Sequence, residues 1–244
     1  ATINPFDSFQ TNTNGTYSLL SAINEAKKNI NSIIIASTDK VYGKYPLNKL
    51  PYKENYKLKC IYPYDVSKAC ADLIAQSFSS NLHRIPICIT RFSNIYGPGQ
   101  INFSALIPDL IRSSLGYSKF IPRTDGTYLR DFVYIDDVVN AYLLISENLD
   151  INTNKMRGQI FNFGTNNLVS VNEIIKKIFL INNNKDELKK IILRMEKSKT
   201  KGEINYQLMD YEKINKYFNY KPKTSFSTGI NKTISWYKKY LKKY

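Results

Sequence analysis

The chain has 244 residues, of which 43% are hydrophobic and 13% aromatic, and its formal net charge is +15. A chain of this length can bury a full core, so the composition indicates a globular protein of one or two domains. No apolar run approaches the ~20 residues of a membrane span, and the N-terminus lacks the pattern of a signal peptide. We therefore expect a cytoplasmic protein without a membrane partner.

The positive charge raises the question of a nucleic-acid partner. It is nearly all lysine spread along the chain, and its dense cluster is confined to residues 238–243. Dispersed lysine favours an ordinary basic surface, so we expect no nucleic-acid partner. The cysteines, Cys60, Cys70 and Cys88, share no metal-ligand spacing, and their odd number argues against a disulfide framework. We expect buried thiols and no metal site.

The N-terminal part of the chain alternates between helical and strand patterns. Apolar residues recur at helical spacing from about residue 13 to 28 and again from 64 to about 80. Residues 32–37 form an unbroken apolar run, which is typical of a parallel strand covered on both faces, and a second strand is expected at residues 86–91. This order predicts an α/β fold. The expected inward faces are Leu19, Leu20, Ile23 and Ala26 in the first helix, and Val66, Ala69, Cys70, Leu73, Ile74, Ser77 and Phe78 in the second.

The pattern changes beyond Gly99. We expect a helix around residues 106–111, a short strand at 130–135, a helix after it and another strand at 159–163. The later part should hold a loop at 182–190 and a final amphipathic helix. The residues that mark these elements are Asp136 and Asp137 as helix caps, Ser170 and Glu173 as a capping box, Ile204, Tyr206 and Leu208 as an alternating segment, and Ile230, Ile234, Tyr237 and Leu241 as the last helical face.

Tyr64 and Lys68 stand four residues apart where a loop becomes a helix. One helical turn separates them, so both side chains share a face. A phenol normally has a pKa near ~10, and an ammonium group beside it favours the phenolate and lowers that pKa. Tyr64 is therefore a candidate general base. The chain has 19 tyrosines, so this spacing also arises by chance and the surrounding motifs must decide.

Those motifs resemble, in order and rough spacing, the extended short-chain dehydrogenases/reductases, NAD-dependent enzymes that remodel nucleotide-activated sugars. The resemblance runs from about residue 5 to the end. It implies a Rossmann-type doubly wound parallel sheet with a smaller α+β C-terminal substrate domain. The matching stretches are residues 12–16, 37–43, 64–68, 91–99, 130–137 and 161–164, which read NTNGT, STDKVYG, YDVSK, RFSNIYGPG, RDFVYIDD and FNFG.

The resemblance also implies a division of the chain. Residues 1–99 and about 130–165 would form the NAD-binding domain, and about 100–129 and 166–244 the nucleotide-sugar-binding domain. The family's glycine-rich turn, whose helix holds the cofactor pyrophosphate, has no counterpart in this sequence. We therefore expect a chain that starts inside the NAD-binding domain, lacks its first strands and binds NAD poorly by itself.

Within the family, the triplet Thr38-Asp39-Lys40 points to the 4,6-dehydratase branch. That reaction oxidises C4 of a hexose, eliminates water across C5 and C6, and returns the hydride to C6. Elimination needs an acid for the C6 hydroxyl and a base for the C5 proton, whereas a simple epimerase does not. The dTDP-glucose enzymes carry Asp-Glu here, and Asp-Lys resembles the CDP-glucose 4,6-dehydratases. A second possibility is another nucleotide-sugar dehydratase or 4-epimerase, and a third is a truncated, inactive copy that only binds.

The resemblance implies a role for each matched residue. Tyr64 would remove the C4 hydroxyl proton, and Lys68 would lower its pKa and contact the nicotinamide ribose. Thr38 would hold the C4 oxygen, Asp39 would act as the acid, and Lys40, with a pKa lowered by burial and neighbouring cations, as the base. Asn94, Asn102, Phe103 and Arg130 would hold the nucleotide diphosphate. A homodimer through the helices near residues 14–28 and 64–80 is implied as well.

Three of these assignments have structural alternatives. Tyr64 and Lys68 could be a surface pair. Asp39 and Lys40 could form a solvated turn, because an acid followed by a base is common in loops. Arg130 could make only a structural ion pair with its neighbour Asp131.

Overall fold

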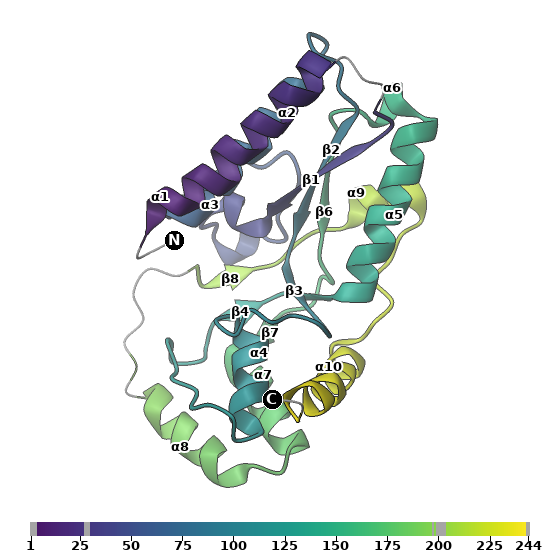
Figure 1. Ribbon diagram of the computed structural model, residues 1–244. Helices are drawn as coiled ribbons and strands as arrows, with labels where there is room; N and C mark the ends of the chain where they lie inside the picture. The colour runs from purple at the N-terminus through teal and green to yellow at the C-terminus, as the bar shows by residue number, and fades with distance from the viewer. Residues whose placement is uncertain (1–3, 27–29, 197, 199–203, 243–244) are drawn as a thin grey trace.

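A three-stranded parallel sheet forms the centre of the upper layer in the computed structural model, which describes residues 4–26, 30–196, 198 and 204–242 (Figure 1). The strands are β1 (Ile33–Thr38), β2 (Ile87–Phe92) and β6 (Ile160–Phe163), in the order β1-β2-β6. All six residues of the central strand β2 are buried. The prediction of strands in these three segments is confirmed, and so is their parallel arrangement.

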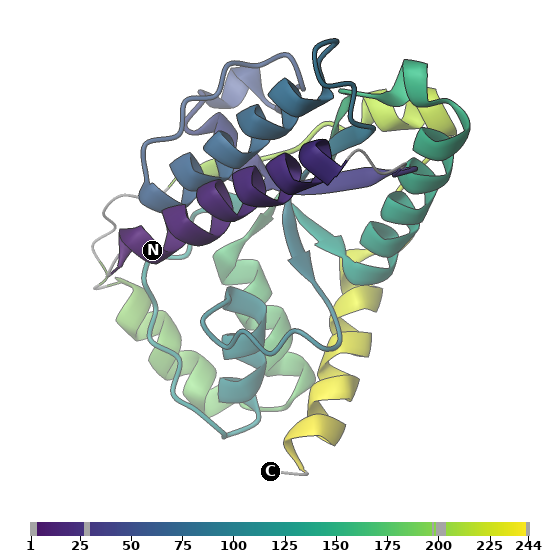
Figure 2. The same ribbon diagram turned by 45° about the horizontal axis from the view of Figure 1, so that its top comes forward.

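Helices cover both faces of this sheet, as expected for a doubly wound fold. On one face, Ile87 and Ile89 of β2 pack with α2 (Gly15–Ala26) and α3 (Pro63–Ser79). On the other face, the alternate residues of β2, such as Cys88, pack against α5 (Ile135–Ile151). Successive side chains of a strand point to opposite faces, so an unbroken apolar run is what a strand between two helical layers requires. Figure 2 shows α2 and α3 lying side by side along the first face.

The first helical segment begins earlier than its apolar pattern indicates. A short helix, α1 (Pro5–Ser8), runs into a π-helical stretch, Phe9–Asn14, which leads directly into α2. Pro5 occupies a first-turn position, where its missing N–H leaves no intrahelical hydrogen bond unmade.

The inward faces expected for α2 and α3 are wrong in part. Leu20 is buried, but Leu19 is 55% exposed. The buried side of α3 holds Asp72 and Ala75, whereas Leu73 is 54% exposed. The apolar pattern predicts the wrong face for two reasons. Small side chains allow a helix to approach a sheet closely, and Asp72 faces inward because it pairs with the buried Arg91. Ala26 and Ser77, which were also expected to face inward, are exposed.

Two smaller sheets connect the upper layer to the lower part of the molecule. The parallel pair β3 (Asn94–Tyr96) and β5 (Phe132–Tyr134) forms one of them. The other has the order β7-β4-β8, with β7 (Val169–Ser170), β4 (Leu129–Arg130) and β8 (Tyr206–Gln207). The single strand expected at 130–135 is therefore two strands in different sheets. Figure 1 shows β4 and β8 between the large sheet and the lower helices.

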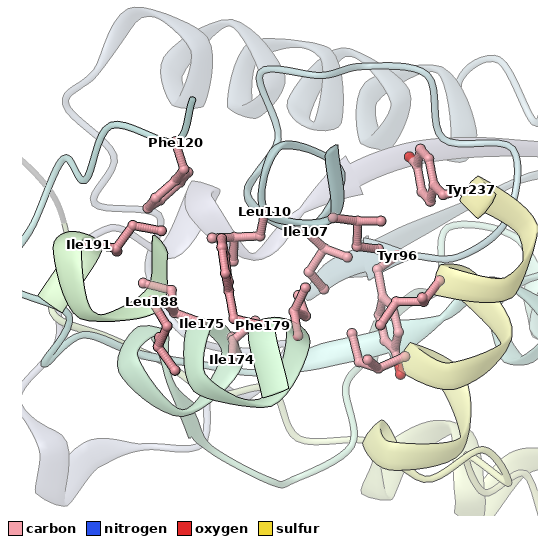
Figure 3. Close-up of a cluster of buried hydrophobic side chains, with 14 of the residues drawn as sticks. Tyr96, Ile107, Leu110, Phe120, Ile174, Ile175, Phe179, Leu188, Ile191 and Tyr237 are labelled. Carbon is pink, nitrogen blue, oxygen red and sulfur yellow. The ribbon is translucent and has the colours of Figure 1, made fainter. Parts of the chain in front are cut away.

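The lower helices share one core around a group of buried aliphatic and aromatic residues (Figure 3). These helices are α4 (Leu106–Ser114), α7 (Val171–Ile181), α8 (Lys185–Glu196) and α10 (Phe226–Leu241). The capping box at the start of α7 and the face expected for α10 are confirmed. The loop expected at 182–190 is wrong from Lys185 onward, because the spacing of three buried residues gives α8 an inward stripe. These residues are Leu188, Ile191 and Met195.

The helix α5 starts at Ile135, with Tyr134 as its N-cap, so Asp136 and Asp137 lie in its first turn and do not cap it. The Asp137 carboxylate instead accepts hydrogen bonds of 3.0 Å from the backbone N–H groups of Lys223 and Thr224. It thereby ties the segment before α10 to α5. The remaining short elements are 3-10 turns at Asp39–Tyr42 and Leu47–Lys49, and the helices α6 (Thr153–Met156) and α9 (Glu212–Phe218).

The expectation of buried thiols is correct for one cysteine. Cys88 is fully buried in β2, whereas Cys60 and Cys70 are partly exposed. None of the described helices is both long and apolar enough to cross a membrane.

Candidate active site

The triplet Thr38-Asp39-Lys40 lies at the carboxyl end of β1, where the strand passes into a 3-10 turn. Asp39 is 1% exposed, and its Oδ1 accepts hydrogen bonds from Thr38 Oγ1 at 3.0 Å and Lys40 Nζ at 3.3 Å. Its second oxygen, Oδ2, is buried without a hydrogen-bond partner among the described residues. Lys40 Nζ also donates to Asn94 Oδ1 at 3.4 Å. The alternative of a solvated turn is therefore wrong.

The pKa of Lys40 is raised, which contradicts the expected lowering. Burial by itself would lower this pKa, but the acidic groups of Asp39, Tyr64 and Asp65 act in the opposite direction and outweigh it. The sequence expectation assumed neighbouring cations, whereas the folded chain places potential anions around the ammonium group. Lys40 is therefore held in its charged form, as one half of an ion pair with Asp39.

Tyr64 stands in the first turn of α3 and is 40% exposed. Partial burial raises the pKa of its phenol, Lys40 opposes that shift, and Asp39 and Asp65 add to it. Lys68 Nζ donates to the backbone oxygen of Ala36 at 2.5 Å, and burial lowers the pKa of this lysine. The expected lowering of the Tyr64 pKa by Lys68 is thus not observed, and the cation that favours its phenolate is Lys40.

Asp65 is a titratable residue of this region that the sequence reasoning passed over. It is 5% exposed, and burial raises the pKa of its carboxyl to about 6, with Asp39 acting in the same direction and Lys40 against it. Its position directly after Tyr64, in the first turn of a helix, was the available signal. An acid there is readily interpreted as a favourable partner of the helix dipole, and its nearness to Asp39 cannot be read from the sequence.

A cavity of about 1120 Å³ opens at the carboxyl ends of β1 and β2 and extends toward α4 and α7. It brings together residues that are far apart in the sequence, and the expected site residues that line it are Thr38, Lys40, Tyr64, Asn94, Asn102 and Arg130. Asp39, Lys68 and Phe103 do not line it. Phe103 instead carries the Arg112 guanidinium over its ring, 4.2 Å from the ring centre.

The side chains expected to hold a diphosphate already have partners within the chain. The Asn94 amide donates to the backbone oxygen of Asp131 at 3.0 Å and accepts from Lys40. Asn102 Oδ1 accepts from the backbone N–H and hydroxyl of Ser104. Arg130 Nη1 donates to the backbone oxygens of Leu129 and Asn205 at 3.0 and 3.2 Å.

Asp131 is fully buried and does not line the cavity. It accepts hydrogen bonds from Thr165 N–H at 3.0 Å and Met209 N–H at 3.3 Å, and burial raises its pKa to about 6. A Cβ at Gly164 would lie 2.2 Å from Asp131 Oδ2, so glycine is required beside this carboxylate. The carboxylate that the sequence placed next to Arg130 therefore joins β4 to the segments after β6 and β8.

A second buried ion pair supports the turn that carries Asp39 and Lys40. Arg91, 2% exposed, donates to both oxygens of Asp72 at 2.8 and 3.0 Å. Its Nη1 donates to the Tyr42 hydroxyl at 2.8 Å, which in turn donates to Asn162 Oδ1 at 2.7 Å. Tyr42 is the last residue of the 3-10 turn, so this network fixes the turn against β2, β6 and α3.

Two buried hydroxyls at the sheet end are left for a polar ligand. Ser37 lies in the last part of β1 and Ser93 directly after β2; both residues line the cavity, and neither Oγ has a hydrogen-bond partner among the described residues. Buried hydroxyl groups are normally hydrogen-bonded, so their position fits a ligand that presents amide or hydroxyl groups to this edge. Tyr64 also lines the cavity near these two hydroxyls.

The chain is similar to proteins that are described as nucleotide-sugar 4,6-dehydratases. The family described as "GDP-mannose 4,6 dehydratase" matches residues 2–233. The dTDP-D-glucose 4,6-dehydratase of Bos taurus is 32% identical over 239 residues, 97% of this chain and 63% of the relative. The structure of dTDP-glucose 4,6-dehydratase from Bacillus anthracis in complex with NAD is 27% identical, with a TM-score of 0.79 over 95% of this chain and 68% of that one.

A protein named for a different activity has a fold as similar to this chain as that of the Bacillus anthracis enzyme. The UDP-glucose 4-epimerase of Thermotoga maritima, solved with UDP-glucose, is 25% identical, with a TM-score of 0.83 over 98% of this chain and 73% of that one. These structures confirm the Rossmann-type α/β fold. The chain spans 63% of the length of the bovine relative.

Proposed function

The chain belongs to the GDP-mannose 4,6 dehydratase family, and on that premise we propose that it carries the catalytic centre of an NAD-dependent nucleotide-sugar 4,6-dehydratase, a lyase. The observation that carries the proposal is the Asp39–Lys40 ion pair beside Tyr64 at one end of a cavity. From the chain itself, oxidation at a hydroxyl needs only a base such as Tyr64, because NAD would accept the hydride. An acid and a second base next to it are what the elimination of water adds.

Tyr64 and Thr38 act at C4 of the hexose in this proposal. Tyr64 takes the proton of the C4 hydroxyl, and Thr38 Oγ1 holds the C4 oxygen. When bound, NAD supplies the acceptor of the C4 hydride and the donor of the hydride that later reaches C6. Tyr64, Lys68 and the hydroxyls of Ser37 and Ser93 suit the nicotinamide end of that cofactor.

The Asp39–Lys40 pair holds the one proton that the elimination requires. Transfer of that proton across the 3.3 Å contact from Lys40 Nζ to Asp39 Oδ1 leaves a neutral amine and a neutral acid. The amine then takes the C5 proton, which the C4 ketone has made acidic. The C5–H bond breaks, the C5–C6 double bond forms, and the C6 hydroxyl leaves as water with the proton from Asp39.

A 4-epimerase is the second candidate, and the burial of Asp39 favours it. Asp39 is 1% exposed and lies behind the cavity wall, where an acid that must reach a C6 hydroxyl is less accessible than Lys40 or Tyr64. Epimerisation at C4 needs Tyr64 and no acid at this position. The two candidates predict different products from the same substrate.

We further propose CDP-glucose as the substrate and a two-part arrangement of the chain. The basis for the nucleotide is Asp39 followed by Lys40, where dTDP-glucose enzymes carry Asp-Glu. Residues 1–99 and about 130–165 would hold the cofactor, and about 100–129 and 166–244 the nucleotide. A homodimer through α2 and α3 is in keeping with the exposure of Leu19 and Leu73 on these helices.

Product analysis tests the reaction. The protein that carries this chain would be incubated with NAD and, separately, with CDP-glucose, dTDP-glucose and UDP-glucose, and the products followed by NMR. We expect a 4-keto-6-deoxyhexose from CDP-glucose. A 4-keto-6-deoxy product from dTDP-glucose or UDP-glucose alone would contradict the nucleotide, and a C4 epimer without dehydration would contradict the reaction.

Titration of NAD against the isolated chain tests the cofactor assignment. We expect weak binding, because the chain contains no glycine-rich turn for the pyrophosphate. Micromolar affinity would contradict this expectation.

A further inference from the structure

Gln207 places an unused hydrogen-bond donor in the wall of the cavity. The residue is 3% exposed, and its Nε2 is buried without a hydrogen-bond partner among the described residues. Its side chain nevertheless lines the same cavity as Lys40 and Tyr64. A buried donor that is left without an acceptor costs folding free energy, so its retention needs an explanation such as a ligand.

The backbone around Gln207 fixes where this amide points. Gln207 pairs with Arg130 across the parallel strands β8 and β4, and its backbone oxygen accepts from Asp131 N–H at 3.0 Å. Residues paired in neighbouring strands direct their side chains to the same face of a sheet. The side chains of Gln207 and Arg130 therefore leave neighbouring strands on the same face of the sheet, and both residues line the cavity.

The position of this pair along the cavity matches the middle of a nucleotide sugar. At one end of the cavity, Thr38, Lys40 and Tyr64 gather where a sugar would react. At the other end, Phe120 and Ile175 belong to the lower core and offer an apolar wall suited to a base (Figure 3). Figure 1 shows β4 and β8 between the two parts. In a nucleotide sugar, the group between the sugar and the nucleoside is a diphosphate.

We propose that Gln207 binds the diphosphate of the nucleotide sugar, with its amide donating to a phosphoryl oxygen beside Arg130. This inference rests on the proposed function, because it takes the ligand to be a nucleotide sugar. It adds a substrate-binding residue that the sequence reasoning did not identify. A donor pair of one cation and one neutral amide suits a phosphoryl oxygen, which accepts several hydrogen bonds at once.

Binding measurements on two substitutions at this position test the inference. Gln207→Met removes the donor at similar size, and Gln207→Glu replaces it with a negative charge. Affinities for CDP, UDP and dTDP, for the matching nucleosides, and for CDP-glucose would be measured by NMR titration. We expect the affinity for the preferred nucleoside diphosphate to fall on the order of tenfold in Gln207→Met and further in Gln207→Glu, while nucleoside affinity is unchanged.

Gln159→Glu is the matched control, because Gln159 lies outside the cavity and donates to the backbone oxygen of Lys155. It adds the same charge elsewhere and should leave every affinity as in the wild type. Folded Gln207 variants that lose affinity for nucleoside and nucleoside diphosphate alike would show that Gln207 does not act on the diphosphate specifically, and that result would overturn the inference.

The remaining outcomes separate this inference from the proposed function. If the wild type binds a nucleoside diphosphate and the Gln207 variants bind it equally well, the inference is overturned and the proposed function stands. A loss seen with CDP-glucose but not with CDP would place Gln207 at the sugar and overturn the inference too. If the wild type binds no nucleoside diphosphate, the proposed function fails, and the inference with it.

Discussion

Two acid–base pairs near the end of the central sheet are built in different ways. Asp72 and Arg91 are 0% and 2% exposed and share two hydrogen bonds, and Arg91 Nη1 donates to the Tyr42 hydroxyl within the protein. Asp39 and Lys40 share one contact of 3.3 Å, the lysine side chain is 33% exposed, and Asp39 Oδ2 has no partner among the described residues. The first pair is closed within the protein, and the second faces a cavity.

The difference indicates which pair maintains the structure and which is available for chemistry. A buried ion pair whose donors and acceptors are all used cannot accept a substrate, and its removal mainly affects folding. A pair with an unused oxygen and an opening to a cavity is a candidate for proton transfer. The two are connected, because Arg91 also holds Tyr42 at the end of the turn that contains Asp39 and Lys40.

The largest effect on stability is expected at the closed pair. Arg91→Leu leaves Asp72 as an unpaired buried carboxylate and should lower the free energy of unfolding by about 3–5 kcal/mol. Urea denaturation measures this. The double variant Arg91→Leu, Asp72→Leu should recover a large part of the loss, because it removes the uncompensated charge. A change below about 1 kcal/mol in the single variant would mean that the closed pair does not maintain the structure.

At the open pair the largest expected effect is on activity. Lys40→Met removes the base for the C5 proton, and the rate of 4-keto-6-deoxy product formation should fall by about 10²–10⁴-fold. Oxidation at C4, followed as absorbance of the reduced cofactor, should fall less. The control is Lys44→Met, an exposed lysine four residues on in the same loop. Equal losses in both steps would mean that Lys40 does not serve elimination.

Asp65, beside the open pair, should give stability a pH dependence. Its carboxyl has a pKa of about 6 in the folded chain, above its usual value, so the folded state binds the proton more tightly than the unfolded state. The free energy of unfolding should therefore decrease as pH rises from about 4 to 6 and level off above that. Asp65→Asn should remove this contribution and raise the free energy of unfolding at pH 7 by about 2 kcal/mol.

Urea denaturation of the wild type and Asp65→Asn across this pH range is the measurement. The Asp131 carboxyl also has a pKa of about 6, so it makes its own contribution to the pH dependence, and this contribution remains in the variant. The free energy of unfolding should therefore fall less steeply with pH in Asp65→Asn than in the wild type. Identical slopes in the wild type and the variant would contradict the assignment of Asp65.

The smallest effect is that of Lys40→Met on stability. Asp39 is left as a buried carboxylate, but it keeps its hydrogen bond from Thr38, and the ammonium that it loses is partly in water. The loss should therefore be smaller than that of Arg91→Leu, about 1–2 kcal/mol. This value, set against that of Arg91→Leu under the same conditions, sharpens the distinction between the two pairs. A loss as large as that of Arg91→Leu would remove the distinction.

The sequence was sufficient to predict the strands of the large sheet and the proximity of the chain segments at their carboxyl ends. The three strands predicted at residues 32–37, 86–91 and 159–163 are all present. Because the carboxyl ends of parallel strands meet at one edge, the chain segments after β1 and β2 could be expected to adjoin, and Lys40 does contact Asn94.

The sequence was insufficient wherever the outcome depends on neighbours in space. The pKa of Lys40 depends on its burial and on Asp39, and also on Tyr64 and Asp65, which come from a helix more than twenty residues away in the chain. The buried side of α3 depends on Arg91 in the next strand. Gln207 sits in a two-residue strand, and no local pattern distinguishes its buried amide from any other glutamine in a loop.

The most direct test of the central claim is the fate of the C5 hydrogen. The protein that carries this chain would be incubated with NAD and CDP-glucose in deuterated water, and the product examined by NMR. Proton removal from C5 by Lys40 predicts a 4-keto-6-deoxyhexose with deuterium at C5, and its loss in Lys40→Met. A product with an intact C6 hydroxyl and no deuterium at C5 would contradict dehydration at the Asp39–Lys40 pair.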